Sequence, residues 1–246
     1  MKLTVVGCAP AWTRRAGRAS SCYLVEQDET AVVFDLGQGA FAELARYVDP
    51  GAVSAVFISH LHADHCVDLV PLRHYLAYER GGGAPSLYGP AELRSRFDAF
   101  QHADFLDGFG GAPLEPGTVT VGSLAIEAGR VTHIPDSFAF RVAAADADGP
   151  GLVYSGDCAV ADDLLPLIQP GDTLLCEAAF GDGPPGGGMH LTAVEAATAA
   201  ATANAARLIL THILDQRLGR DLAATARRVY RRQVLVAEPG MNVTVD

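Results

Sequence analysis

The segment His60-Leu61-His62-Ala63-Asp64-His65 constrains the fold of this chain more than any other feature. It directly follows the apolar run Val56-Phe57-Ile58, which is typical of a buried strand. Four potential metal ligands within six residues cannot all lie on one face of a strand or helix. A loop from a strand into a helix can turn them toward one point, so we predict a metal site here rather than a polar loop with incidental histidines.

The donor types narrow the choice of metal. Three imidazoles and a single carboxylate favour borderline ions such as Zn, Mn or Fe over Ca or Mg.

The rest of the sequence predicts alternating strands and helices. In the first half we expect strands at 2–6, 21–26, 31–34, 55–58 and 87–88, and helices near 41–48, 67–78 and 91–101. In the second half we expect strands at 118–121, 124–127, 137–143, 152–155, 173–176, 208–210 and, last, 234–236. A capping box, Thr192-Ala193-Val194-Glu195, begins a helix to about residue 204, and another helix is expected near 218–231. Two mixed sheets, each covered outside by helices, accommodate this order.

The motifs taken together resemble a known family. The pattern His60-x-His62-x-Asp64-His65 resembles the signature of the metallo-β-lactamase superfamily. Further segments are similar to that family in the same order: Phe34-Asp35-Leu36-Gly37, Ser155-Gly156-Asp157, Cys176-Glu177-Ala178, His190-Leu191-Thr192 and Leu210-Thr211-His212. The chain looks most like the phosphodiesterase branch, which includes ribonuclease Z and atypical class II cyclic nucleotide phosphodiesterases of actinobacteria. The resemblance implies an α/β fold, the αββα four-layer sandwich, with residues 1–246 forming a single hydrolase domain.

The resemblance also implies a site for two divalent metal ions, expected to be Zn, with Mn or Fe as alternatives. It assigns one ion to His60, His62, His133 and Asp157. It assigns the other to Asp64, His65, Asp157 and His212, so that the Asp157 carboxylate bridges both ions. The residues themselves leave alternatives open. Asp157 could be a turn residue after glycine, and His133 could be a structural histidine in a loop. Asp35 could either orient a ligand histidine or begin a helix.

Three residues are expected to act on the substrate. The resemblance implies that His190, paired with Glu177, assists departure of an alcohol. Asp64 could accept a proton from the nucleophile, a hydroxide held between the two ions. The alternative for His190 is a solvated loop residue. The segment Gly181–Gly188 before it could act as a lid. His74, His102, Cys66 and Cys158 are expected to stay outside the site.

The net charge of −11 disfavours large RNA as a partner, because binding a polyanion depends on clustered Lys and Arg. Two basic clusters stand out: Arg14, Arg15 and Arg18, and then Arg227, Arg228, Arg231 and Arg232. We interpret the second as the solvated face of a C-terminal helix.

The five cysteines lack the regular spacing of a disulfide framework, which fits a reducing compartment. No apolar run reaches membrane-spanning length, so we expect a soluble, cytoplasmic protein without a membrane partner, which could form a homodimer.

The function favoured by these features is metal-dependent hydrolysis of a small phosphodiester such as a cyclic nucleotide. The alternatives are tRNA 3′ processing like that of ribonuclease Z, hydrolysis of an ester, lactone or thioester, and a non-catalytic ligand-binding role on the same fold.

Overall fold

A six-stranded sheet contains most of the strands from the first half of the chain, in the order β13-β1-β2-β3-β4-β5. The computed structural model describes residues 1–81, 83–146, 148–184, 188–215, 217 and 220–245. The strands of this sheet are β1 (Lys2–Gly7), β2 (Cys22–Gln27), β3 (Thr30–Phe34), β4 (Ala55–Phe57), β5 (Ser86–Tyr88) and β13 (Asn242–Thr244). Strands β1, β2 and β3 pair antiparallel, whereas β3, β4 and β5 are parallel. The sheet is therefore mixed.

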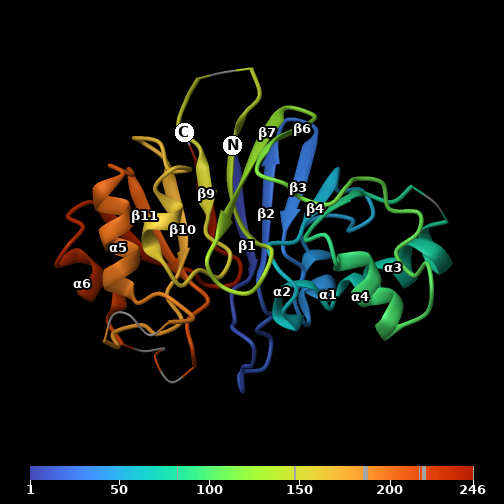
Figure 1. Cartoon of the computed structure of the whole chain (residues 1–246), viewed down its shortest axis with the longest axis horizontal. Helices are drawn as coiled ribbons and strands as arrows, with labels where there is room; N and C mark the ends of the chain where they lie inside the picture. The colour runs from blue at the N-terminus through green and yellow to red at the C-terminus, as the bar shows by residue number, and fades with distance from the viewer. Residues whose placement is uncertain (82, 147, 185–187, 216, 218–219, 246) are drawn as a thin grey trace.

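A seven-stranded sheet, in the order β12-β11-β10-β9-β8-β7-β6, lies against the first (Figure 1). Its strands are β6 (Gly117–Val121), β7 (Leu124–Val131), β8 (Ser137–Ala144), β9 (Leu152–Tyr154), β10 (Thr173–Glu177), β11 (Arg207–Thr211) and β12 (Gln233–Val236). Strands β6 to β9 form an antiparallel meander, and β9 to β12 are parallel. Both sheets thus contain a parallel part, whose strands end at the same edge.

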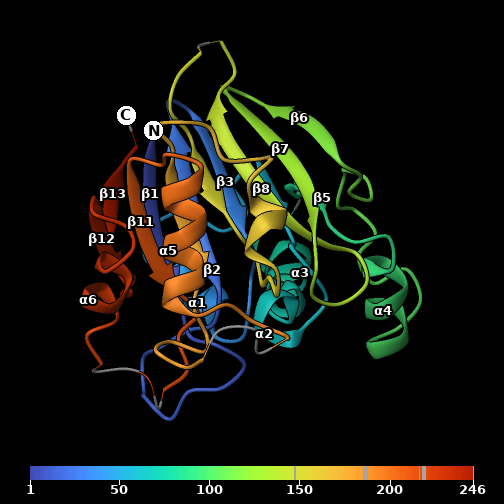
Figure 2. The same cartoon turned by 60° about the vertical axis from the view of Figure 1, so that its left-hand side comes forward.

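Helices cover the outer faces of both sheets (Figures 1 and 2). The helices on the first sheet are α1 (Ala40–Leu44), α2 (Ala63–Cys66), α3 (Leu69–Tyr75), the π-helical turn η1 (Leu76–Arg80) and α4 (Leu93–Phe100). The second sheet is covered by the short 3₁₀ helix η2 (Ala161–Leu164), α5 (Ala193–Thr202) and α6 (Leu222–Arg227). Alanines on one face of α5 pack closely onto β10 and β11. This arrangement confirms the predicted sandwich of two mixed sheets flanked by helices.

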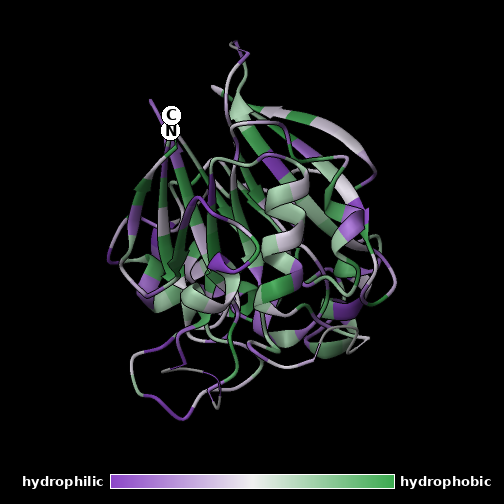
Figure 3. Cartoon of the chain, turned by 90° about the vertical axis from the view of Figure 1, so that its left-hand side faces the viewer, coloured by the Kyte–Doolittle hydropathy of each residue, from purple (hydrophilic) through white to green (hydrophobic). Residues whose placement is uncertain are grey.

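The largest aromatic side chains fill the space between the sheets. Phe34 and Phe57 of the first sheet meet Phe140 and Tyr154 of the second. The Phe34 ring centroid lies 5.2 Å from that of Phe140 and 6.4 Å from that of Tyr154. Figure 3 shows predominantly hydrophobic strands in this interior and hydrophilic segments in the surrounding loops. Burial of apolar surface between two sheets and under two helical layers is the main stabilising contribution to such a fold.

The structure corrects four predicted boundaries. The prediction that 234–236 form the last strand is wrong, because β13 follows and pairs with β1, from Lys2↔Thr244 to Thr4↔Asn242. Strand β7 continues to Val131, because the long partner β8 supplies hydrogen bonds along its length. Helix α1 ends at Leu44, and α6 spans only Leu222–Arg227. Predicted positions 218 and 219 of that helix lie outside the described residues.

Two further findings concern helices. The predicted capping box is confirmed, since Thr192 Oγ1 accepts from the Glu195 backbone while the Glu195 carboxylate accepts from the Thr192 backbone. Among the described residues, the structure contains no helix with the length and apolarity needed to span a bilayer.

Candidate metal centre

The ends of strands from both sheets meet at one edge of the sandwich, the lower edge in Figure 1. The predicted metal ligands all follow the ends of four strands. His60, His62, Asp64 and His65 follow β4, His133 follows β7, Asp157 follows β9 and His212 follows β11. The carboxyl ends of parallel strands are a common place for ligand sites, because loops from neighbouring strands converge there. All seven side chains come together at this edge, although up to 152 positions separate them in sequence, from His60 to His212.

The first group comprises His60, His62, His133 and Asp157, whose potential ligand atoms all lie within 4.8 Å of one another. His62 Nδ1 is 3.0 Å from His60 Nε2 and 3.2 Å from His133 Nε2. The Asp157 carboxylate completes the group, with Oδ2 3.7 Å from His60 Nε2 and 3.8 Å from His133 Nε2.

The second group comprises Asp64, His65 and His212, again with ligand atoms within 4.8 Å of one another. Asp157 lies between the two groups: its Oδ1 is 3.3 Å from His65 Nε2, and its Oδ2 is 3.3 Å from His212 Nε2. Both of these histidines belong to the second group, and Oδ2 also lies 3.7 Å from His60 Nε2 of the first group, so Asp157 is placed to serve both groups.

The residues present fit divalent metal ions. His65 Nε2 and Asp157 Oδ1 are buried and lie 3.3 Å apart, but neither forms a hydrogen bond of normal geometry with a described residue. Buried polar atoms are normally satisfied, so an unpartnered pair calls for a ligand that the protein atoms do not supply. Imidazole nitrogens and carboxylate oxygens at this density are the donor set of borderline divalent cations.

The electrostatics of the site favour the ligand forms of most of these side chains. Burial lowers the pKa of His60, His62 and His133, and it lowers the pKa of His212 to about 4. A lowered pKa keeps an imidazole neutral, which is the form that binds a metal. Burial opposes ionisation of Asp157, but the imidazoles around it, His212 foremost, hold its pKa well below the ordinary value.

Outward-facing hydrogen bonds orient the histidine rings. Nδ1 of His60 lies 3.0 Å from Ser59 Oγ, and Nδ1 of His212 lies 3.2 Å from Ser21 Oγ. His133 Nδ1 is 2.9 Å from the carbonyl oxygen of Met189. A partner on one ring nitrogen fixes the orientation of the ring and leaves the other nitrogen free toward the centre.

Asp35 is the most densely bonded of these outer partners. Its Oδ2 lies 2.6 Å from His65 Nδ1 and accepts from Tyr154 Oη at 2.6 Å and from Ser59 Oγ at 2.8 Å. Its Oδ1 accepts from the Ser59 backbone at 2.7 Å. From the sequence, Asp35 could either begin a helix or orient a ligand histidine. Its contact with His65 favours the orienting role. Burial lowers the pKa of His65, but the Asp157 and Asp35 carboxylates outweigh it, so this pKa lies well above its ordinary value.

Backbone geometry at the strand ends is strained in places. Asp35 and His212 adopt φ of 59° and 55°, in the left-handed region that non-glycine residues rarely adopt. Gly156, before Asp157, has φ of 56°, and a Cβ there would lie 2.6 Å from the carbonyl oxygen of Phe138. Only glycine fits that position, and strain of this kind is concentrated at functional sites.

Glu177 and His190 lie beside the cluster. His190 Nδ1 is 2.9 Å from Glu177 Oε1 and 3.7 Å from Asp157 Oδ2. The buried Glu177 carboxylate also accepts from the backbone nitrogens of Cys158 and Ala179, each at 3.0 Å. Burial raises the pKa of Glu177. Burial lowers the pKa of His190, but the hydrogen bond and charge of Glu177 outweigh it and raise that pKa above its ordinary value. His190 is therefore held toward its protonated form.

The two remaining histidines lie against an aromatic ring, and the two cysteines beside the motifs are buried, as expected. His74 on α3 and His102 after α4 both contact the ring of Phe105. Cys66 and Cys158 are buried, and burial raises the pKa of each thiol to about 12.

The proposed lid is described only in part, since residues 185–187 of Gly181–Gly188 lie outside the described residues. At its start, Asp182 accepts from Arg217 at 2.9 Å and Arg220 at 3.0 Å, so this end of the segment is tied to the chain beyond β11.

Two adjoining pockets open at the cluster and share His62. One, of about 340 Å³, is lined by Pro10, Ala11, Trp12, His62, Ala63, Asp64, Asp157, Ala179, His190, His212 and Leu214. The other, of about 410 Å³, is lined by Leu61, His62, Pro90, Glu92, Arg96, Ile134, Pro135 and Asp136. Pockets of this size accommodate small molecules. The sequence analysis did not predict that four further residues lie next to the site: Trp12, Ser21, Ser59 and Tyr154. Only Ser59 could have been suspected from the sequence, because it directly precedes the metal motif.

The layers and the convergent His/Asp groups are those of a metallo-β-lactamase-fold hydrolase. The chain belongs to the β-lactamase superfamily, since the family described as "Beta-lactamase superfamily domain" matches residues 30–213. This family confirms the resemblance carried by the sequence motifs.

Individual relatives agree with this assignment. The chain is 35% identical over 239 residues to the uncharacterized protein Rv1339 of Mycobacterium tuberculosis, covering 92% of this chain and 86% of that protein. It is 29% identical to the probable metallo-hydrolase YhfI of Bacillus subtilis, covering 98% of each. The crystal structure of YhfI superposes with a TM-score of 0.87 over 99% of both chains. The short form of human tRNase Z, 23% identical, shares the fold with a TM-score of 0.77 over 100% of both chains.

Proposed function

We propose that this protein is a dinuclear metal-dependent phosphodiesterase that acts on a small phosphodiester such as a cyclic nucleotide. The observation that carries the proposal is the Glu177–His190 pair, with His190 Nδ1 2.9 Å from Glu177 Oε1 and 3.7 Å from Asp157 Oδ2. A protonated imidazole beside a metal cluster is well suited to give a proton to a departing alkoxide.

The proposed ligands divide into two sets that share Asp157. One ion would be held by His60, His62, His133 and Asp157, and the other by Asp64, His65, Asp157 and His212. Zn is the expected metal, with Mn or Fe as alternatives. When bound, two such cations would acidify water and offset the negative charge of a phosphodiester.

The chain's own groups supply the proton transfers. Glu177 fixes the His190 ring and stabilises its charged form, so that a proton stays available on the leaving-group side. Asp64 Oδ2 lies 3.6 Å from His65 Nε2 and 3.7 Å from His212 Nε2, near the place where the nucleophile would form. This carboxylate is therefore the candidate acceptor for the proton of the nucleophile.

The volumes of the two pockets and the net charge of the chain support a small substrate. The two pockets beside the cluster, of about 340 and 410 Å³, match the size of a nucleotide better than that of a folded RNA. The net charge of −11 opposes long-range attraction of a large polyanion.

A second candidate is tRNA 3′ processing. It is favoured by a sequence similarity, since the chain is 26% identical to a protein named ribonuclease Z from Haloferax volcanii, in an alignment that covers 100% of this chain and 95% of that protein. Ester, lactone or thioester hydrolysis would use the same metals. A thioester releases a thiolate, which leaves without a proton, whereas an ester or lactone releases an alkoxide that would accept the His190 proton as well.

The deciding experiment is a turnover screen of the purified, metal-loaded chain. It should hydrolyse cyclic nucleotides and a generic aryl phosphodiester faster than a lactone or precursor tRNA. Cleavage of precursor tRNA with no activity on either small phosphodiester would replace the proposal with the second candidate. Turnover of the lactone alone would indicate a carboxylic-ester hydrolase.

A further inference from the structure

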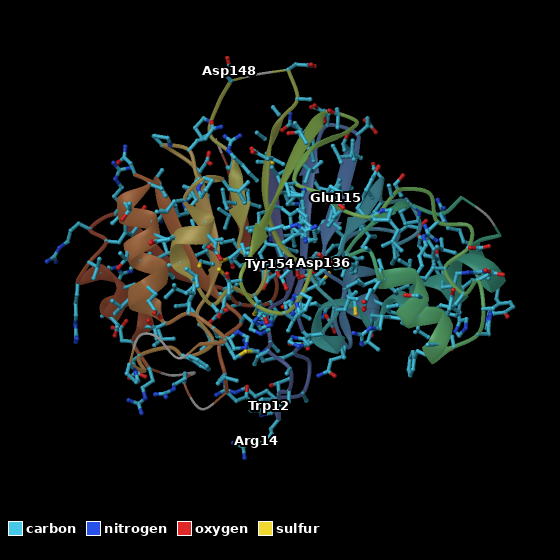
Figure 4. All side chains as sticks on the ribbon, viewed as in Figure 1. Trp12, Arg14, Glu115, Asp136, Asp148 and Tyr154 are labelled. Atoms are coloured by element: carbon cyan, nitrogen blue, oxygen red, sulfur yellow. The ribbon has the colours of Figure 1, made fainter. Side chains whose placement is uncertain are left out.

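Trp12 is the chain's single tryptophan, and it lies in an unusual place. Its side chain is 55% exposed on the loop between β1 and β2, although an indole normally contributes most when buried. Figure 4 shows this loop projecting beyond the lower edge of the sandwich, with Trp12 between the sheets' edge and Arg14. Trp12 also lines the pocket that contains Asp157, His190 and His212. A large exposed apolar ring at a candidate reaction centre is suited to contact a ligand.

The backbone on both sides of Trp12 is anchored. On one side, the Ala11 carbonyl oxygen accepts from Gln38 Nε2 at 3.2 Å. On the other, Thr13 Oγ1 donates to Asp215 at 3.1 Å and the Arg14 backbone donates to the same carboxylate at 2.9 Å. Gln38 follows β3 and Asp215 follows β11, so both sheets hold the loop. The backbone that carries the indole is thereby held in place next to the pocket, which reduces the ordering cost of binding a ligand.

The pocket has two chemically different parts. One part of its lining is apolar and consists of Pro10, Ala11, Trp12, Ala63, Ala179 and Leu214, and the other part consists of candidate metal ligands and His190. A ligand that suits both parts has an anionic group at one end and a flat apolar ring at the other. A nucleotide has this composition, and aromatic side chains stack on nucleobases regardless of base identity.

We infer that Trp12 is a stacking platform for the nucleobase of the substrate, and that the substrates are therefore nucleotide phosphodiesters rather than phosphodiesters in general. This inference rests on the proposed phosphodiesterase function, and it assigns Trp12 as a residue that determines specificity. Stacking without hydrogen bonds to base edges should tolerate different bases.

Two chromogenic esters with the same leaving group test the inference by turnover. Thymidine 5′-(4-nitrophenyl phosphate) carries a base, and methyl 4-nitrophenyl phosphate does not. The wild-type chain should favour the first, and Trp12→Ala should lower the ratio of the two kcat/KM values by about tenfold. Trp12→Phe should retain most of the ratio, because a phenyl ring can still stack. Tyr78→Ala, which removes an aromatic ring that is 85% exposed on η1, is the matched control and should leave the ratio unchanged.

If both esters are hydrolysed but Trp12→Ala lowers both rates by the same factor, Trp12 does not read the base, and the phosphodiesterase proposal stands. If the wild-type chain hydrolyses neither of these esters nor a cyclic nucleotide, the phosphodiesterase proposal fails, and a binding measurement decides about Trp12.

That measurement uses tryptophan fluorescence, which in this chain comes from Trp12 alone. Titration of the metal-loaded chain with adenosine 5′-monophosphate should quench the emission, whereas ribose 5-phosphate, which lacks the base, should not. Free tryptophanamide titrated in parallel corrects for absorption by the nucleotide. Unchanged emission on addition of the nucleotide, or equal quenching by both ligands, would overturn the inference.

Discussion

His190 Nδ1 lies 2.9 Å from the Oε1 atom of Glu177, a carboxylate that has no exposed surface. Two backbone N–H groups also hold this carboxylate in place, so it cannot follow His190 if the imidazole moves. The pair therefore fixes the ring at Nδ1, the nitrogen that also lies 3.7 Å from Asp157 Oδ2. Two predictions depend on this geometry.

The first concerns the leaving group. His190→Ala should lower kcat by about 10²–10⁴-fold for a phosphodiester that releases a ribose alkoxide, because general acid catalysis is lost. The loss should be much smaller for a nitrophenyl ester, since nitrophenolate departs without a proton. His102→Ala, which alters an exposed histidine outside the site, is the control and should match the wild type on both substrates. Equal losses for the two substrates would show that His190 only binds or positions the substrate.

The second prediction concerns pH. The Glu177 carboxylate keeps the pKa of His190 above its ordinary value against the opposing effect of burial. The protonated form therefore persists to higher pH, and activity that needs it should fall as the pH rises through this raised pKa. Glu177→Gln removes the negative charge, so the alkaline limb of the kcat profile should move to lower pH. The measurement uses the ribose-leaving substrate, and a limb at the same pH in both proteins would rule out this role for Glu177.

A third prediction tests the bridging position of Asp157. The protein purified without chelator should contain about two metal ions per chain. Asp157→Ala removes a carboxylate whose oxygens face His65 and His212, so metal content should fall to about one ion or less and turnover should be lost. Elemental analysis and an activity assay provide the readouts. His74→Ala should retain both properties, and equal losses in two folded variants would remove Asp157 from the site.

A fourth prediction separates the orienting role of Asp35 from its contribution to the fold. Asp35→Asn should weaken metal affinity by about 10–100-fold, because the amide cannot reproduce the charge next to His65 Nδ1. Asp172→Asn is matched to it, since Asp172 is equally buried but bonds Arg141 at the opposite part of the second sheet. It should lower the free energy of unfolding without changing metal affinity, as measured by competition with a chelator. A similar loss of affinity in both variants would indicate a general effect on the fold.

Local sequence determined much of the fold and one part of the site. The His60–His65 motif, the strand before it and the capping box at Thr192 are each contained in a few consecutive residues. Hydrophobic periodicity and capping are local properties, so these elements could be predicted directly. His133, Asp157 and His212 are isolated in sequence, and only their resemblance to a family pattern identified them.

Contacts between distant segments decided the rest. Strand β13 has only three residues, Asn242–Thr244, and exists because β1 offers a free edge 238 positions earlier, at Thr4. The bond from Tyr154 to Asp35 spans 119 positions, and Trp12 reaches the pocket because Gln38 and Asp215 hold its loop. Local patterns in the sequence specify which chemical groups are available and which segments form strands and helices. Only the packing of the two sheets decided which of those groups meet. Residues become neighbours across the layered core through strand pairing and burial between distant segments, and a local sequence pattern contains no information about either.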